Sequence, residues 1–212
     1  MGELKILNTS QIKYSYGVIF QVKTIGKVYK EKFFGREKKV KKPCHKKGEL
    51  YQGGYKIMEF EKFHSFQLDV FRLNNKYYIL SKIDNLFGLY DISNKSNVKF
   101  TKHTFVPEQF KTNGENKLIL IINKEILYLK INLVEDSIKY ILVDKISDFK
   151  SDKGIWLDIN WESKLSFDTM LVNCKNNKVS RNEYDRYQRM ILKVRLDKDK
   201  MTYIKSFVEP SN

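Results

Sequence analysis

The sequence is built from short runs in which apolar and polar residues alternate, and this period of two limits the fold more than any other feature. Successive side chains of a β-strand point to opposite faces of a sheet, so these runs predict strands with one buried face. Short groups of Asn, Asp, Gly and Lys separate the runs, as at Asn74–Asn75 and Asn123–Lys124. Such brief connections favour antiparallel hairpins and meanders over parallel strands joined by helices. The sequence therefore predicts an all-β protein, mainly antiparallel.

The expected strands are the runs richest in β-branched and aromatic residues. They lie at residues 16–24, 27–34, 55–63, 66–73, 76–82, 86–92, 97–105, 117–123, 125–131, 136–143, 154–161, 166–174, 190–196 and 201–207. The triplet Ile-Gly-Lys at 25–27 is expected to be a turn, and residues 106–110 to form a single helical turn. Ser180 and Glu183 have the spacing of a capping box, which predicts one short helix over 180–190 or, alternatively, a strand from Tyr187.

Two segments of equal length, 76–105 and 117–146, share a pattern of three strands at an offset of 41 residues. Residues 187–207 repeat its last two strands, and residues 50–63 repeat them faintly. About four sheet units of this size would suit a small β-propeller-like repeat. A sandwich or a barrel is the alternative, because any antiparallel meander produces similar runs. We expect one β-rich domain over residues 1–212.

Composition excludes several classes of protein. A chain that is 42% hydrophobic and 14% aromatic is not a disordered tail. The longest apolar run, Leu118–Ile122, is far too short to span a membrane, and the N-terminal residues lack the apolar core of a signal peptide. Two cysteines do not make a disulfide framework. We expect a cytoplasmic, intracellular protein without a membrane partner.

The positive charge is concentrated in one segment. The formal net charge is +15, and residues 27–47 hold ten basic and two acidic residues, a net charge of +8. Apolar residues are too few at 35–49 for a core strand, so this part is expected to be a basic loop or a solvated hairpin tip. Clustered lysines attract phosphate backbones through counterion release, without sequence information.

These features predict a non-enzymatic protein that binds nucleic acid or another polyanion. Aromatic residues beside the lysines would stack on unpaired bases, and no helix-turn-helix or zinc-finger pattern is present, so RNA or single-stranded DNA is the expected ligand. The expected binding residues are the basic Arg36, Lys38, Lys39, Lys41, Lys42, Lys46 and Lys47 and the aromatic Tyr29, Phe33 and Tyr51, with Phe34 beside them. A propeller-like interaction scaffold with an acidic protein partner is an alternative.

The first enzymatic alternative lies in residues 154–164. Asp158 and Glu162 fall on one face of the expected strand, and the ending Glu-Ser-Lys at Lys164 resembles the Glu-x-Lys end of a metal-dependent nuclease motif. The resemblance implies that the acid pair holds Mg²⁺ and that the lysine steadies the attacking water or the scissile phosphate. The acidic partner in that family lies on a preceding strand, and helices flank its sheet; this chain departs from both.

The second enzymatic alternative is the pair Glu59 and Glu61, which alternate on one face of the strand at 55–63. They resemble the inward-pointing glutamates with which triphosphate-tunnel enzymes hold a metal ion. The lysine that this family places two residues later is absent, because Phe63 stands there. Mg²⁺ or Mn²⁺ is expected only in these two alternatives, and no cofactor or metal in the binding protein.

Overall fold

The computed structural model describes residues 3–123, 125–135 and 137–147 with their side chains, except that of Phe33, and the backbone of four later strands within residues 155–209. The chain divides into two compact units, Met1–Val106 and Pro107–Asn212, a division that the expectation of one domain did not include.

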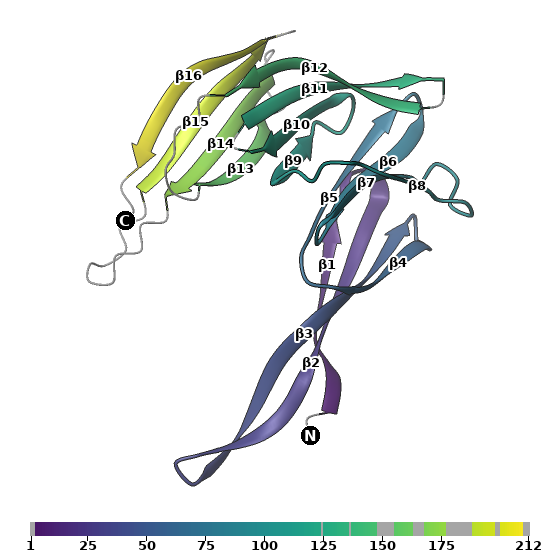
Figure 1. Ribbon diagram of the computed structural model, residues 1–212. Helices are drawn as coiled ribbons and strands as arrows, with labels where there is room; N and C mark the ends of the chain where they lie inside the picture. The colour runs from purple at the N-terminus through teal and green to yellow at the C-terminus, as the bar shows by residue number, and fades with distance from the viewer. Residues whose placement is uncertain are drawn as a thin grey trace. The chain divides into compact units, whose positions relative to one another are not determined.

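The described chain is almost entirely β-strand, in open four-stranded antiparallel sheets (Figure 1). Each sheet is a meander of consecutive strands: β1–β4 and β5–β8 in the first unit, β9–β12 and β13–β16 in the second. The strands are β1 (Glu3–Lys13), β2 (Val18–Phe33), β3 (Arg36–Gln52), β4 (Tyr55–Phe63), β5 (Phe66–Leu73), β6 (Lys76–Ile83), β7 (Leu86–Asp91), β8 (Lys99–Lys102), β9 (Gln109–Thr112), β10 (Lys117–Ile122), β11 (Glu125–Val134), β12 (Ser137–Ile146), β13 (Ile155–Glu162), β14 (Asp168–Asn176), β15 (Gln188–Asp197) and β16 (Lys200–Glu209). A short 3₁₀ turn, η1 (Ser15–Gly17), joins β1 to β2.

The all-β, antiparallel prediction is confirmed, and the sequence repeat has a structural counterpart. The segments 76–105 and 117–146 contain β6–β8 and β10–β12, which occupy the same positions in two successive sheets. The third repeat in the sequence, residues 187–207, contains β15 and β16, which are again the last two strands of a sheet. The repeating unit is thus a four-stranded meander, and none of the described sheets closes into a barrel.

The expected turn at 25–27 is wrong, because β2 runs straight through it. The register of β2 against β3 shifts between Ile25 and Gly26, which marks a bulge. A Cβ atom at Gly26 would overlap the Leu7 side chain and the backbone carbonyl of Lys42. This glycine therefore permits the close approach of neighbouring strands rather than a reversal of the chain.

The basic loop expected at 35–49 is also wrong, because these residues belong almost entirely to β3. The strand pairs with β2 along its whole length, from Val18 opposite Gln52 to Phe33 opposite Arg36. Backbone hydrogen bonds hold this ladder, so its outer part needs no apolar face. The solvated hairpin tip that was the other expectation is reduced to the two residues Phe34 and Gly35.

Three further outcomes are local. β1 was not expected, and its burial pattern is mostly exposed. Residues 109–112 form β9 rather than part of a helical turn. Of the two alternatives at 180–190, a short helix or a strand from Tyr187, the structure has the strand, because β15 begins at Gln188; residues 180–187 lie outside the described residues.

The core of the first unit lies between its two sheets. Val18, Phe20 and Leu50 of the first sheet are fully buried with Val70 and Ile79 of the second. Aromatic rings join the two layers, because Phe20 meets Phe66 edge to face at 5.0 Å between ring centroids. Burying each large apolar side chain contributes roughly 1.5–3 kcal/mol, so this layer anchors the inner halves of β2 and β3.

The second unit has its own buried strand. Leu118–Ile121 of β10 are buried at four successive positions, so both faces of this strand are covered. Phe110, Ile126 and Tyr128 on the two flanking strands are buried with them.

Candidate nucleic-acid interface

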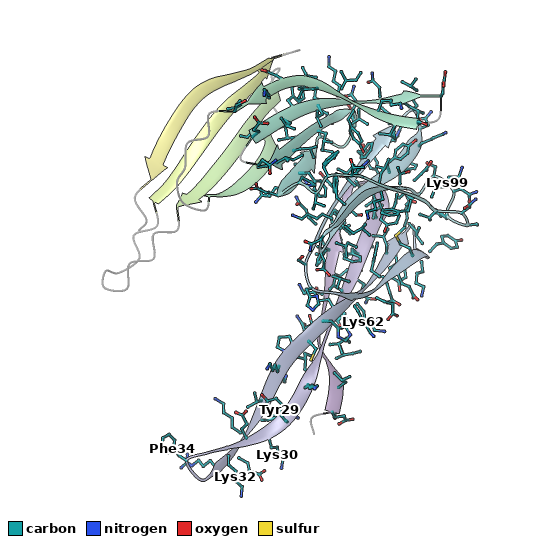
Figure 2. All side chains as sticks on the ribbon, viewed as in Figure 1. Tyr29, Lys30, Lys32, Phe34, Lys62 and Lys99 are labelled. Carbon is teal, nitrogen blue, oxygen red and sulfur yellow. The ribbon has the colours of Figure 1, made fainter. Side chains whose placement is uncertain are left out.

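A two-stranded ribbon extends from the first sheet and is called the arm here, residues 27–42 of β2 and β3 with the turn between them (Figure 2). Its inner end is held by a third strand, because β1 pairs with β2 as far as Glu3 opposite Val28. On the other side, the pairing of β4 with β3 ends at Lys46. The outer part, from Tyr29 opposite Val40 to the tip, therefore has two strands only. Sheet pairing positions the arm, and most of its described side chains are exposed to solvent.

Both faces of the arm are basic. Residues opposite each other in an antiparallel ladder share a face, and the face alternates along each strand. One face carries four basic residues and one acidic residue, Lys30, Lys32, Lys39, Lys41 and Glu37. The other face carries the same balance, Lys27, Arg36, Lys38, Lys42 and Glu31. The arm is thus positively charged all round.

Most of this charge is not neutralised within the described part of the chain. Lys30 forms an exposed ion pair with Glu37, with 2.7 Å between Nζ and Oε2. The remaining basic residues of the arm form no ion pair with a described residue: Lys27, Lys32, Arg36, Lys38, Lys39, Lys41 and Lys42. All of them are exposed to solvent.

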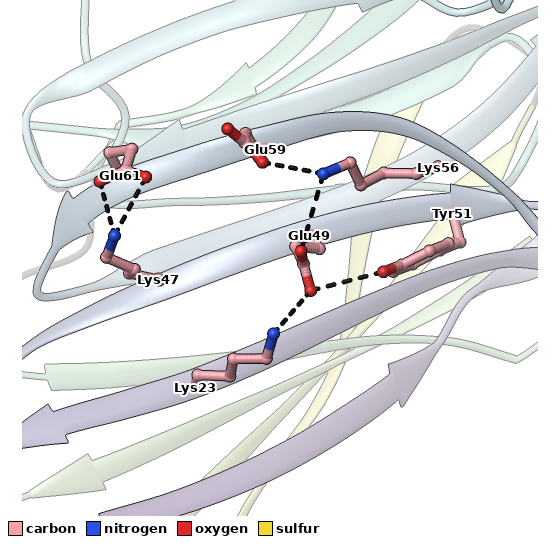
Figure 3. A network of polar contacts seen from close by, with 7 residues as sticks. All are labelled: Lys23, Lys47, Glu49, Tyr51, Lys56, Glu59 and Glu61. Atoms are coloured by element: carbon pink, nitrogen blue, oxygen red, sulfur yellow. Dashed lines mark hydrogen bonds and ion pairs between the residues drawn. The ribbon is translucent and has the colours of Figure 1, made fainter. Parts of the chain in front are cut away.

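Three lysines nearer the body of the sheet, Lys23, Lys47 and Lys56, differ from these because each has a glutamate partner (Figure 3). Lys23 Nζ lies 2.9 Å from Glu49 Oε2, and Lys56 Nζ lies 2.9 Å from Glu59 Oε2. The hydrogen bond from Lys23 is the main cause that lowers the pKa of Glu49 below its ordinary value. Part of the basic charge in the body of the sheet is therefore compensated by glutamates, whereas most of that on the arm is not.

The tip of the arm is an unusual hairpin turn. Phe34 and Gly35 have φ angles of 49° and 74°, the pattern of a type I′ turn, in which both central residues are left-handed. A bulky residue is strained in this region, where Gly, Asn and Asp are preferred. Other hairpin turns of the described chain also begin with a residue of positive φ. These residues are Gly53, Asn74, Asp84, Asn123 and Glu135.

Phe34 is also the most exposed large apolar side chain of the described residues, at 93%. The tip therefore combines a backbone conformation that disfavours phenylalanine with a position that leaves most of its side-chain surface exposed. Strain of this kind accumulates at functional sites. Figure 2 shows Phe34 at the end of the arm, beyond Tyr29, Lys30 and Lys32.

The structure gathers part of the predicted binding set on the arm. Arg36, Lys38, Lys39, Lys41 and Lys42 all lie on its β3 strand.

The rest of that set is distributed differently. Lys46 lies over the Phe66 ring at 5.5 Å, and Lys47 pairs with Glu61. Tyr51 belongs to the body, where its hydroxyl donates a hydrogen bond to Glu49. Tyr29 is half-buried on the arm. Phe33 ends β2, and its side chain lies outside the description.

Sequence reasoning missed the β2 half of the arm, Lys27, Lys30 and Lys32, and the special place of Phe34. The charge count over 27–47 contained the lysines, but the expected turn and loop separated them from the β3 lysines. Recognising Phe34-Gly35 as a two-residue hairpin turn would have joined the two halves.

The enzymatic candidates on β4 are engaged in ion pairs. Glu59 and Glu61 are exposed and bound by Lys56 and Lys47 respectively, on an open sheet (Figure 3). The hydrogen bond from Lys47 is the main cause that lowers the pKa of Glu61. Among the residues searched, those that the structure describes, no three His, Cys, Asp or Glu side chains gather closely enough to hold a metal ion.

The candidates of the other enzymatic alternative, in residues 154–164, lie mostly outside the described residues. The backbone of β13 carries Asp158 opposite Asn173 and Glu162 opposite Thr169. Their side chains, and Lys164 altogether, lie outside the described residues.

No family model matches the chain, and no curated protein matches it in sequence. In the described residues, no helix has the length and apolar character that crossing a membrane requires.

Proposed function

We propose that this protein binds nucleic acid through the arm. The observation that carries the proposal is the uncompensated positive charge on both faces of an exposed ribbon. Polyphosphate backbones are the ligands that such charge recruits, because each neutralised phosphate releases condensed counterions.

The different pairing of lysines in the body of the sheet and in the arm supports this proposal. Lys23, Lys47 and Lys56 are paired with glutamates, so their charge stabilises the sheet locally. Apart from Lys30, which pairs with Glu37, the basic residues of the arm form no ion pair with a described residue, and placing them side by side costs electrostatic free energy. A bound polyanion would offset that repulsion.

The class of nucleic acid depends on the aromatic residues. The sequence favoured RNA or single-stranded DNA because Tyr29, Phe33 and Tyr51 would flank a loop. Tyr51 hydrogen-bonds to Glu49 in the body instead, and Tyr29 is half-buried. Among the described aromatic side chains of the arm, Phe34 is the exposed one.

The test is the salt dependence of binding, measured by fluorescence anisotropy with labelled single-stranded and duplex oligonucleotides between about 50 and 200 mM salt. Replacing Lys38, Lys39, Lys41 and Lys42 together by glutamine should weaken binding. It should also reduce the slope of log K against log salt by about 0.9 per lysine on duplex DNA and about 0.7 on single strands.

The matched control removes the same charge elsewhere in the same unit. Lys13, Lys62, Lys99 and Lys102 are exposed and lie outside the arm. Their combined replacement by glutamine should leave the slope nearly unchanged. Equal effects of the two variants, or no binding by the unmodified protein, would overturn the proposal.

A further inference from the structure

We infer that the arm enters the major groove of double-stranded DNA tip first, with Phe34 meeting the edges of the bases. This inference rests on the proposed function and names its ligand. It is carried by the dimensions of the arm, the symmetry of its charge and the residue at its tip.

The dimensions of the arm match this groove. Five residues on each strand, 29–33 and 36–40, form the two-stranded part. At about 3.3 Å per residue they extend roughly 17 Å, more than the depth of the major groove, about 8.5 Å. The major groove, about 12 Å wide, admits a two-stranded β-ribbon, whereas the minor groove is only about 6 Å wide.

The charge on both faces suits a ligand with two walls. In a tip-first approach, the face with Lys30, Lys32 and Lys39 meets one phosphate backbone. The opposite face, with Arg36 and Lys38, meets the other. A single strand presents one backbone and would engage only one face. The balanced charge of the two faces is therefore explained by a duplex.

The third observation is the residue at the tip of the arm, Phe34. The chain places a strained, 93% exposed phenylalanine where its other hairpin turns mostly use Gly, Asn or Asp. At the floor of the major groove, the apolar group that a phenyl ring can cover is the thymine methyl. The tip would thereby exchange an exposed ring for a buried contact.

Duplex RNA is a poor match for the same geometry. The A-form major groove is deep and narrow, and its wide minor groove is shallow and lined by hydroxyl groups. Neither offers both a passage for the ribbon and methyl groups at its floor.

The first experiment compares one sequence as duplex DNA, single-stranded DNA and duplex RNA, by anisotropy at matched salt. Duplex DNA should bind at least about tenfold more tightly than either of the others, because only it engages both faces and the tip. Equal or tighter binding of the single strand or of RNA would overturn this inference but leave the proposed function standing. Failure of all three to bind would remove both.

The second experiment tests the tip with Phe34→Asn, which keeps the turn type. The variant should bind a thymine-rich duplex about tenfold more weakly, the loss expected when a phenyl contact is removed. Replacing thymine by uracil, which removes the methyl group, should weaken the unmodified protein by about fourfold and leave Phe34→Asn unchanged.

The matched control is Tyr55→Asn, an aromatic side chain that is 69% exposed beside another hairpin turn. This substitution should change neither the affinity for the thymine-containing duplex nor that for the uracil-containing duplex. Dimethyl sulfate protection identifies the groove, because it modifies guanine N7 in the major groove and adenine N3 in the minor groove. Protection at adenine N3 alone, or an equal uracil effect in both proteins, would overturn the inference.

Discussion

The ring of Phe20 on β2 lies across Gly48 on β3, where a Cβ atom would overlap it. Val22 is the residue directly opposite Gly48, so Phe20 reaches it diagonally along the ladder. The absence of a side chain at Gly48 lets the ring remain in the core beside Phe63, with 6.1 Å between ring centroids. The inner end of the β2–β3 hairpin thus packs against the core at this point.

Gly48→Ala should therefore destabilise the first unit, although alanine is ordinarily better than glycine in a strand. Overpacking of this kind costs about 1–3 kcal/mol, which urea unfolding followed by circular dichroism would measure. In a double-mutant cycle, Gly48→Ala should destabilise the Phe20→Leu variant less than the unmodified protein, because leucine lacks the ring atoms that the new Cβ atom would overlap. Additive effects of the two substitutions would contradict the contact.

Phe34→Asn should stabilise the protein while weakening its binding to DNA. Asparagine tolerates the left-handed conformation that strains Phe34, and Asn-Gly is the preferred type I′ pair. We expect a gain of about 1 kcal/mol in the free energy of unfolding. A loss of stability would mean that the exposed ring contributes to the fold, and the functional reading of its strain would fail.

Removing the outer arm should leave the fold intact. Tyr29 and Val40 occupy the same kind of position in the alternating ladder as Phe33 and Arg36, which flank the natural turn, so Asn-Gly can join them in place of residues 30–39. The removed side chains are mostly exposed, and the unfolding free energy should change by less than about 1 kcal/mol. Circular dichroism and urea unfolding measure this. Loss of cooperative unfolding would show that the arm is structural, whereas an intact fold without DNA binding is expected.

Asp84 should make stability depend on acid pH. Its carboxylate accepts hydrogen bonds from the backbone N–H groups of Ser65 and His64, at 2.8 and 3.0 Å, and the Ser65 bond is the main cause that lowers its pKa. A lowered folded-state pKa contributes stability above the ordinary value of 3.8, and that contribution is lost as pH falls through the lower folded-state pKa.

Asp84→Asn retains a residue that accepts the local positive φ but removes the charge. We expect a loss of about 1 kcal/mol at neutral pH, a low value because the carboxylate is 37% exposed. Urea unfolding at neutral pH and at about pH 3 should show a smaller acid-induced loss in the variant than in the unmodified protein. Parallel pH profiles would contradict this assignment.

Strand positions were predictable where one face of the strand is buried and a turn bounds it. β4 and β5 have the limits that alternation and the flanking Gly53–Gly54 and Asn74–Asn75 pairs indicated. Prediction failed at Gly26, because a glycine that allows close strand approach looks like a turn residue when its neighbours in space are unknown. It also failed at β3, whose outer half buries no apolar face.

The same limits apply to the candidate site. The excess of charge at 27–47 was visible in the residues themselves, as were the basic side chains on what became β3. The pairing of Lys30 with Glu37, and the place of Phe34 beyond both strands, depend on a register that the side-chain pattern does not encode.

By itself, the sequence determined that this protein is a series of antiparallel meanders and that its positive charge is concentrated in one segment. These properties follow from local alternation, short connections and composition, which need no knowledge of partners in space. Only the tertiary structure decided that the basic segment is a strand paired with a second basic strand, presenting charge on two faces and a phenylalanine at its tip. Backbone hydrogen bonds form that ladder regardless of side-chain polarity, so a pattern of buried and exposed residues could not reveal it.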